Sequence, residues 1–277
     1  MTDADLLSLV NASGYPFQLK VEHEIRKTFK RHRKEILATE HKWEDRATGD
    51  HGFIDLVLRT GMVGRVVIEC KRVQGGGQWV FLVPNTADGF VHWARFHWSR
   101  LGKDRRPMSG WDGFNFKMMS HASSFCVVRG HGEKTPSMLE RLGGWLVKAT
   151  ECLAEEELQF APGEGRSTLV IYFPTIITNA KLMICKYDPE VIGLEDGMLP
   201  QGEFAEVPFI RFTKSLPSRI PSSRIPSDLG ASAEENQRTI LIVNANWMIE
   251  VFGGTWEMAD TGMGGVPWES ERWRTDQ

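Results

Sequence analysis

Two apolar runs separated by glycines form the clearest hydrophobic pattern in the chain. The first run covers residues 53–58 and the second covers residues 65–70, and the break at 60–64 contains two glycines. Apolar runs of this length, bounded by turn residues, are typical of buried strands. We therefore expect a hairpin here.

An amphipathic helix is predicted ahead of the hairpin. From Phe17 to Ile36, apolar residues recur on one helical face, which favours a helix over residues 17–37. The opposite face is basic, and its cations are Lys20, Lys27, Lys30, Arg31 and Lys34, with Arg26 and Arg33 toward its flank. Such a face is typical of a surface that follows a phosphate backbone, and also of an ordinary solvated surface.

The remaining pattern predicts further strands and helices. Helices are expected at 1–11, 88–101 and 136–158, and strands around Trp43 and at 78–83, 168–178, 180–187, 206–213 and 239–244. The turn at Thr178-Asn179 indicates that 168–178 and 180–187 form a hairpin. Residues 214–237 contain Ser-Arg-Ile-Pro-Ser twice and few apolar residues, so we expect a mobile loop there.

Composition is that of an ordinary globular protein. Of the 277 residues, 41% are hydrophobic and 25% are charged, with a formal net charge of −3, so any surface for nucleic acid must be local. The four cysteines are too scattered for a zinc site or a disulfide framework, which favours reduced thiols and a cytoplasmic location. We find no pattern of a secretory leader or a membrane span, and expect no membrane partner.

Three charged residues interrupt the apolar runs of the hairpin. Asp55 lies in the first run, whereas Glu69 and Lys71 lie two residues apart at the end of the second, so on a strand these two share a face. Converging carboxylates repel each other unless a cation neutralises them. A divalent cation held by Asp55 and Glu69 is one explanation. The other is an edge hairpin with a cross-strand Asp–Lys pair and a solvated Glu.

At Asp55 and at Glu69-Cys70-Lys71 the chain resembles the PD-(D/E)XK nuclease superfamily, which includes many restriction endonucleases. A second acidic-x-Lys triplet, Glu40-His41-Lys42, lies in a polar segment without the hairpin context, and we interpret it as lying outside the site. The resemblance implies a restriction-endonuclease-like α/β core over residues 1–135, with a central mixed sheet flanked by helices. Residues 136–277 are then a strand-rich α/β extension packed on that core.

The resemblance also implies roles for the hairpin residues. Asp55 and Glu69 would bind one or two Mg²⁺ or Mn²⁺ ions, with the Cys70 carbonyl as a further ligand. Lys71 would orient the attacking water and offset charge on the phosphate.

A further site residue is expected from the first helix, which in such nucleases often supplies another acid. The matching position here is Gln18. Either Gln18 or Glu22, one turn later, takes this role, and the alternative for Glu22 is an ordinary ion pair with Arg26.

The activity implied by the resemblance is metal-dependent hydrolysis of phosphodiester bonds, in DNA rather than RNA, in bacterial defence or a mobile element. The helix cations and Arg72 are the candidate nucleic-acid contacts. The alternative is a catalytically inactive protein of this fold that binds nucleic acid or a partner, since the helix acid is missing. Trp268 and Trp273 in a polar segment indicate docking onto the body or onto a second subunit, so a homodimer is a candidate.

Overall fold

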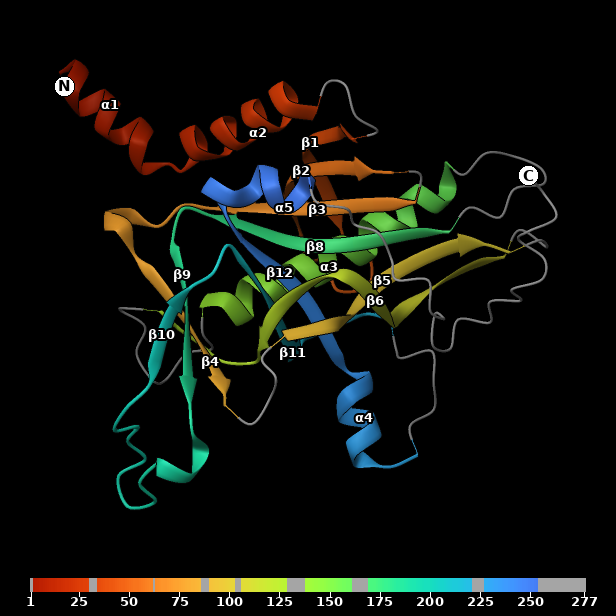
Figure 1. The fold of residues 1–277 in the computed structure, drawn as a ribbon. Helices are drawn as coiled ribbons and strands as arrows, with labels where there is room; N and C mark the ends of the chain where they lie inside the picture. Colours follow the sequence, from red (N-terminus) through yellow and green to blue (C-terminus); the bar gives the residue numbers. More distant parts are fainter. Residues whose placement is uncertain are drawn as a thin grey trace.

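The computed structural model describes residues 2–29, 34–61, 63–85, 90–102, 106–128, 138–160, 169–220 and 227–253. Its helices are α1 (Asp3–Ala12), α2 (Tyr15–Phe29), α3 (Met138–Gln159), α4 (Leu229–Glu235) and α5 (Met248–Gly253), with short 3₁₀ turns at Gln74–Gly76, Pro189–Val191 and Ala245–Trp247. The strands are β1 (Lys34–Glu44), β2 (His51–Thr60), β3 (Gly64–Lys71), β4 (Gln78–Pro84), β5 (Phe90–Leu101), β6 (Pro107–Ser123), β7 (Cys126–Val128), β8 (Val170–Thr178), β9 (Lys181–Tyr187), β10 (Glu203–Glu206), β11 (Phe209–Ser215) and β12 (Gln237–Asn244). The fold is α/β, with a mixed sheet flanked by helices (Figure 1).

The main sheet of the described residues has the order β1-β2-β3-β8-β12-β11-β6-β5. β2 and β3 form the expected antiparallel hairpin, and β3 pairs with β8 in parallel. β5 also pairs with β8, so the far part of the sheet closes into a ring of β8, β12, β11, β6 and β5. A second sheet has the order β10-β9-β4-β7. Strands from both sides of residue 135 therefore share each sheet.

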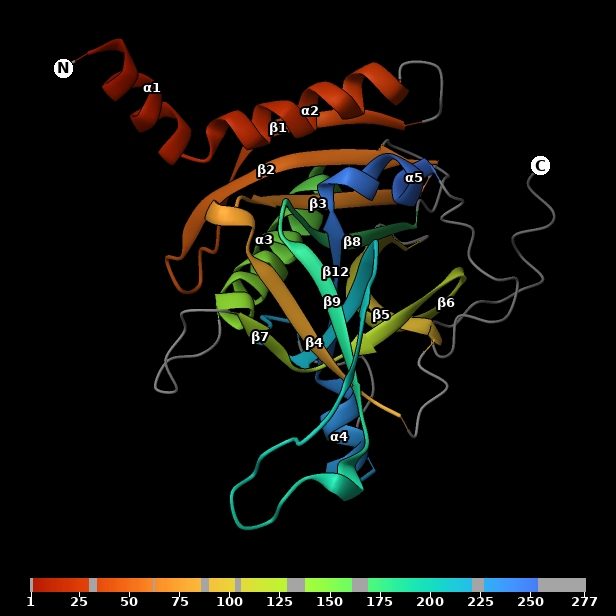
Figure 2. The ribbon, with the colours of Figure 1, turned by 60° about the vertical axis from the view of Figure 1, so that its left-hand side comes forward.

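Two apolar clusters pack on the main sheet. Figure 2 shows the helices of the two clusters on different sides of β2 and β3, with α2 and α5 on one side and α3 on the other. One contains Val21, Ile25 and Phe29 of α2, whose four-residue spacing places them on one helical face, together with the buried residues of α5. The other contains the buried face of α3 and the inner residues of the second sheet. α3 packs closely on β12 at Gly143, where an added Cβ would lie 2.6 Å from Ile240 Cδ1.

Two predicted helices differ from the structure. The helix predicted over 17–37 ends at Phe29, residues 30–33 lie outside the described ranges, and Lys34 begins β1. The pairing of β1 with β2 along its length outweighs the helical periodicity. The helix predicted over 88–101 is wrong, because residues 90–101 form β5. There Ala94, Phe96 and Trp98 pack in one cluster and alternate with polar residues, which is the period of a strand.

Two predictions about the later part of the chain are also corrected. Residues 168–178 and 180–187 do form strands, but β8 belongs to the main sheet and β9 to the second, so they are not a hairpin. The segment 214–237 contains α4 and the end of β11, and polar contacts described below hold Ser218 and Arg219. Residues 221–226 of that segment, together with Trp268 and Trp273, lie outside the described residues. No helix in the described ranges is long and apolar enough to cross a membrane.

Candidate functional site

The candidate site lies where the ladder between β2 and β3 ends. The last pair is Leu56 with Ile68, and the next residues on the two strands are Asp55 and Glu69. Here a side chain replaces the backbone ladder, because Asp55 Oδ2 accepts a 2.6 Å hydrogen bond from the Cys70 backbone N–H. The two acids of the sequence prediction are thus brought to one end of the hairpin.

β8 holds the other edge of β3 through the whole of this stretch, including the pairing of Lys71 with Thr178. Glu69 and Lys71 are both partly buried. Since they are two residues apart on one strand, their side chains leave the same face. The carboxylate and the ammonium group that the resemblance requires therefore come from one rigid element.

Glu40 of β1 is a third acid beside Asp55, although we expected it to lie outside the site. Its side chain accepts a hydrogen bond from the Gln18 amide of α2. Its neighbours Thr39 and His41 pair with Leu56 and Ile54 of β2, so Glu40 lies across from Asp55. The triplet Glu40-His41-Lys42, which we expected to lack the hairpin context, lies in β1 and thus beside the hairpin strand β2.

The backbone of Glu40 is also unusual. Its φ is 49°, and among the described residues it is the one non-glycine residue with positive φ. A side chain in this left-handed region costs about 1–2 kcal/mol relative to an ordinary conformation. Strain of this kind concentrates at functional sites. No pattern in the sequence around Glu40 indicates it.

Electrostatics set these acids apart from ordinary surface carboxylates. Burial raises the pKa of Asp55 to about 6, with the hydrogen bond from Cys70 opposing the shift and the charge of Glu40 adding to it. Burial also raises the pKa of Glu69 to about 8, with the charge of Asp55 adding to the shift and Lys71 opposing it. The two carboxyl groups therefore lack enough positive charge to remain ionised together.

The Cys70 side chain is not suited to act as a nucleophile. Burial raises the pKa of its thiol well above the ordinary value, and the charges of Asp55 and Glu69 raise it further. The thiolate, which is the reactive form, is thus disfavoured. The contribution of Cys70 to the site is through its backbone.

The structure separates the two helix candidates. Gln18 reaches the site through Glu40, whereas Glu22 Oε1 accepts a 2.8 Å bond from Arg26 Nε. Glu22 thus forms the i,i+4 ion pair that was the alternative role for it.

Among the described residues, the predicted nucleic-acid contacts lie on or beside different elements. Lys20 and Lys27 lie on the exposed face of α2, and Lys20 pairs with Glu24. Lys34 lies on β1, where its ammonium group donates to the Phe252 carbonyl and burial lowers its pKa. Arg72 donates to a backbone carbonyl of α1, and Lys30, Arg31 and Arg33 lie outside the described residues.

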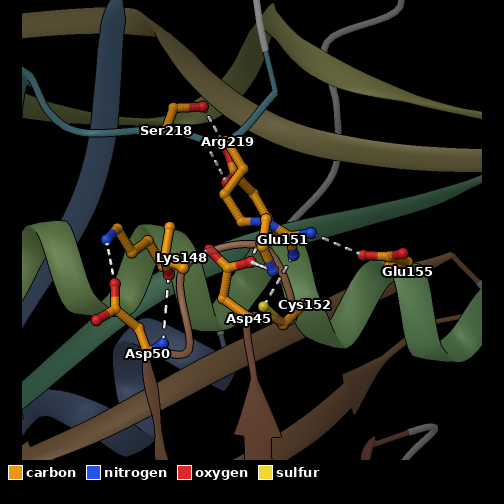
Figure 3. Close-up of polar contacts among 10 residues, drawn as sticks. Asp45, Asp50, Lys148, Glu151, Cys152, Glu155, Ser218 and Arg219 are labelled. Atoms are coloured by element: carbon orange, nitrogen blue, oxygen red, sulfur yellow. Dashed lines mark hydrogen bonds and ion pairs between the residues drawn. The ribbon is translucent and has the colours of Figure 1, made fainter.

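A second group of buried acids lies against α3 (Figure 3). Asp45, at the end of β1, is fully buried. It accepts 2.9 Å hydrogen bonds from the Ala47 N–H and the Thr48 hydroxyl and lies 3.1 Å from Arg219 Nε. Burial raises the pKa of Asp45, but these hydrogen bonds and the charge of Arg219 outweigh it, and the net shift is downward.

Glu151 of α3 is the other acid of this group. It is buried and accepts hydrogen bonds from Trp111 Nε1 at 2.7 Å, from the Arg219 N–H at 2.8 Å and from the Ser218 hydroxyl. The Arg219 guanidinium also donates to Glu155 at 3.2 Å. These acids are matched by donors of the chain itself, and they fasten the segment after β11 to α3.

The β2–β3 site can hold a metal ion with few protein ligands. No group of three or more His, Cys, Asp or Glu side chains in the described parts of the chain is arranged to bind a metal. Asp55 and Glu69 nevertheless supply two carboxylates that lack a sufficient cation, and Cys70, whose carbonyl is the further candidate ligand, follows Glu69 on β3. This set fits Mg²⁺, which keeps several water ligands and is usually bound by one or two carboxylates beside phosphate.

Comparison of the chain with protein-family models, with curated proteins and with solved structures found no match.

Proposed function

We propose that this protein is a metal-dependent nuclease with a restriction-endonuclease-like core, which hydrolyses phosphodiester bonds in DNA. The observation that carries the proposal is the pair of partly buried acids, Asp55 and Glu69, at the end of the β2–β3 ladder with raised pKa values. A fold that buries two carboxylates without sufficient positive charge loses stability. A cation bound at the site together with the substrate would offset that loss.

The structural setting supports the same assignment. The hairpin of β2 and β3 is followed by parallel pairing of β3 with β8, and α2 packs on the same strands. This gives the central mixed sheet with a helix ahead of the hairpin that the resemblance implies. Functions in bacterial defence or in a mobile element are part of the proposal on the resemblance alone.

Each site residue has a distinct task in this proposal. Asp55 and Glu69, together with the Cys70 carbonyl, would hold Mg²⁺ or Mn²⁺. The metal, when bound, supplies Lewis-acid polarisation of the phosphate and lowers the pKa of water. Lys71 would orient the attacking water and stabilise the negative charge that grows on the phosphoryl oxygens.

Gln18 and Glu40 form the adjoining part of the site. The Gln18 amide donates to the Glu40 carboxylate, so Gln18 would position this acid instead of binding the metal directly. The charge of Glu40 raises the pKa of both Asp55 and Glu69. Glu40 thus increases the demand for a cation at the site.

The direct test is cleavage by the purified chain. Duplex DNA, single-stranded DNA and RNA are each incubated with Mg²⁺, with Mn²⁺ and with a chelator. Cleavage should require the metal and should disappear in Asp55→Ala and Lys71→Ala. Glu22→Gln is the matched control, because Glu22 pairs with Arg26 and should be dispensable. Activity that survives in both site variants would refute the assignment.

A second candidate is a protein of the same fold that binds nucleic acid or a protein partner without cleavage. It is favoured by the absence of a three-ligand metal group in the described residues and by Gln18 at the helix position. Calorimetric titration with Mn²⁺ separates the two proposals. A nuclease should bind Mn²⁺ in a manner that requires Asp55 and Glu69, whereas the inactive protein should show no such site.

A further inference from the structure

A protruding acidic segment that follows β9 and includes β10 is not used by the proposed nuclease site. We name residues 188–206 the acidic arm. The arm contains six acids and no lysine or arginine, the acids being Asp188, Glu190, Glu195, Asp196, Glu203 and Glu206. In both ribbon views its loop extends from the body at the end opposite to α1 and α2 (Figures 1 and 2). A segment of this charge repels nucleic acid, so it is suited to a different partner.

The arm exposes apolar side chains between its acids. Leu194 is fully exposed, Met198 is 66% exposed and Phe204 is 64% exposed. Neighbouring exposed apolar side chains with charged residues around them are typical of a protein-binding surface.

The loop of the arm is held in one conformation by its own hydrogen bonds. The Gly197 N–H donates to the Gly193 carbonyl at 2.8 Å, and the Gly193 N–H donates to the Met198 carbonyl at 3.2 Å. The Met198 N–H donates to Asp196 Oδ1 at 2.9 Å, and Gly197 supplies the positive φ of 66° that the turn requires. A loop that is already ordered loses little conformational entropy on binding.

The outer face of α2 is complementary to the arm in both charge and polarity. Its exposed residues are Tyr15, Leu19, Lys20, His23, Arg26, Lys27 and Thr28. At 3.6 residues per turn all of these except Thr28 form one stripe about 140° wide. Glu22 and Glu24 border this stripe, where they pair with Arg26 and Lys20. Tyr15 and Leu19 are each 63% exposed, so this face is apolar as well as basic.

We propose that the acidic arm of one copy of this chain docks on the outer face of α2 of a second copy. The arm cannot reach α2 of its own chain, because the two lie at opposite ends of the molecule (Figures 1 and 2). The contact joins two different surfaces, so repeated docking gives a ring or an open filament. Leu194 and Met198 would pack on Tyr15 and Leu19, with the acids of the arm facing Lys20 and Lys27.

Sedimentation velocity of the full chain over a range of concentrations tests this proposal. The wild type should form species larger than a monomer as concentration rises, and added salt should weaken them because exposed charges are screened. The double variant Leu194→Asp, Met198→Asp should stay monomeric. Leu229→Asp is the matched control, since Leu229 of α4 is 89% exposed and lies outside both surfaces. A wild type that remains monomeric at every concentration overturns the proposal.

A charge exchange shows whether these two surfaces meet. Glu190→Lys with Glu195→Lys makes the arm basic, and Lys20→Glu with Lys27→Glu makes the α2 face acidic. Each double variant alone places like charges opposite one another and should be monomeric, whereas an equal mixture should associate again. All four positions are exposed, so circular dichroism should show folded proteins. A mixture that stays monomeric would contradict the arm-to-α2 contact, even if the wild type associates.

Discussion

Asp45 and Asp55 belong to two groups of acids, and their pKa values shift in opposite directions. Asp45 is fully buried, yet its pKa is lowered, because Ala47, Thr48 and Arg219 surround the carboxylate with donors. Asp55 is less exposed to compensating donors, and its pKa is raised to about 6, because burial disfavours the charged form, the charge of Glu40 adds to this shift, and the hydrogen bond from Cys70 opposes it only in part.

The contrast between the two groups separates structural acids from candidate functional ones. An acid that stabilises a fold is given its donors by the chain, as the α3 cluster is (Figure 3). The β2–β3 acids lack enough of these donors, so their full ionisation depends on a cation from outside. Burial alone does not distinguish the two groups. The number of hydrogen-bond donors and cations around each carboxylate does.

The largest expected effect is on cleavage, and it should be confined to one of the two groups. Asp55→Asn should lower the metal-dependent rate by at least about 10³-fold, since the site loses charge that holds the metal and orients the phosphate. Asp45→Asn should leave the rate per folded molecule unchanged. Single-turnover cleavage, corrected for the folded fraction, makes the comparison. Equal losses in the two variants would remove the distinction between the groups.

The next effect is on stability, and it should fall on the other group. Arg219→Ala leaves Asp45 buried without its cation, which should reduce the free energy of unfolding by about 3 kcal/mol. Urea denaturation of Arg219→Ala measures this, with Arg46→Ala as the control because Arg46 is exposed. A loss no greater than that of the control would show that the α3 cluster does not fasten the segment after β11.

These two groups also show how far the sequence could predict the molecule. The hairpin and the pair Asp55 and Glu69 could be predicted, because acids inside apolar runs are a local signal. The α3 cluster could not, since Asp45, Glu151 and Arg219 are far apart in sequence and meet only when β1, α3 and the segment after β11 pack together. Glu40 was missed because its left-handed backbone has no local sequence signature.

The strand errors have a related cause. The aromatic run of β5 has both helical and strand periodicity, and its long pairing with β6 decides the outcome. β8 and β9 are adjacent in sequence but enter different sheets, which no turn residue between them indicates. Where the local sequence pattern predicted the wrong element or the wrong partner, the pairing between strands determined the structure.

The pH dependence of stability should have opposite signs in the two groups. Asp55 and Glu69 have raised pKa values of about 6 and about 8, so the folded state keeps protons that the unfolded chain releases. Their contribution is fully present below about pH 4 and is lost as the pH rises through these values, at a cost on the order of 2 kcal/mol or more. The contribution of Asp45, whose pKa is lowered, is present at neutral pH and is lost in acid.

Urea denaturation across the pH range in chelator measures both slopes. Asp55→Asn with Glu69→Gln should flatten the decline toward alkaline pH, and Asp45→Asn should flatten the decline toward acid. Added Mg²⁺ should stabilise the wild type more as pH rises, because its ligands must be deprotonated. Parallel curves for the wild type and the Asp55, Glu69 variant would contradict the raised pKa values.

The smallest effect concerns the strain at Glu40, which the well-matched α3 cluster does not share. Glu40→Gly and Glu40→Ala both remove the carboxylate and its bond from Gln18, but only alanine retains a Cβ at φ 49°. The glycine variant should therefore be more stable than the alanine variant by about 1 kcal/mol. If Glu40 acts with Asp55 and Glu69, both variants should lose cleavage equally despite this difference in stability. Gln18→Ala, which keeps the carboxylate but not its hydrogen bond, should lie between them and the wild type in cleavage. Equal stability of the two Glu40 variants would show that no strain is stored there.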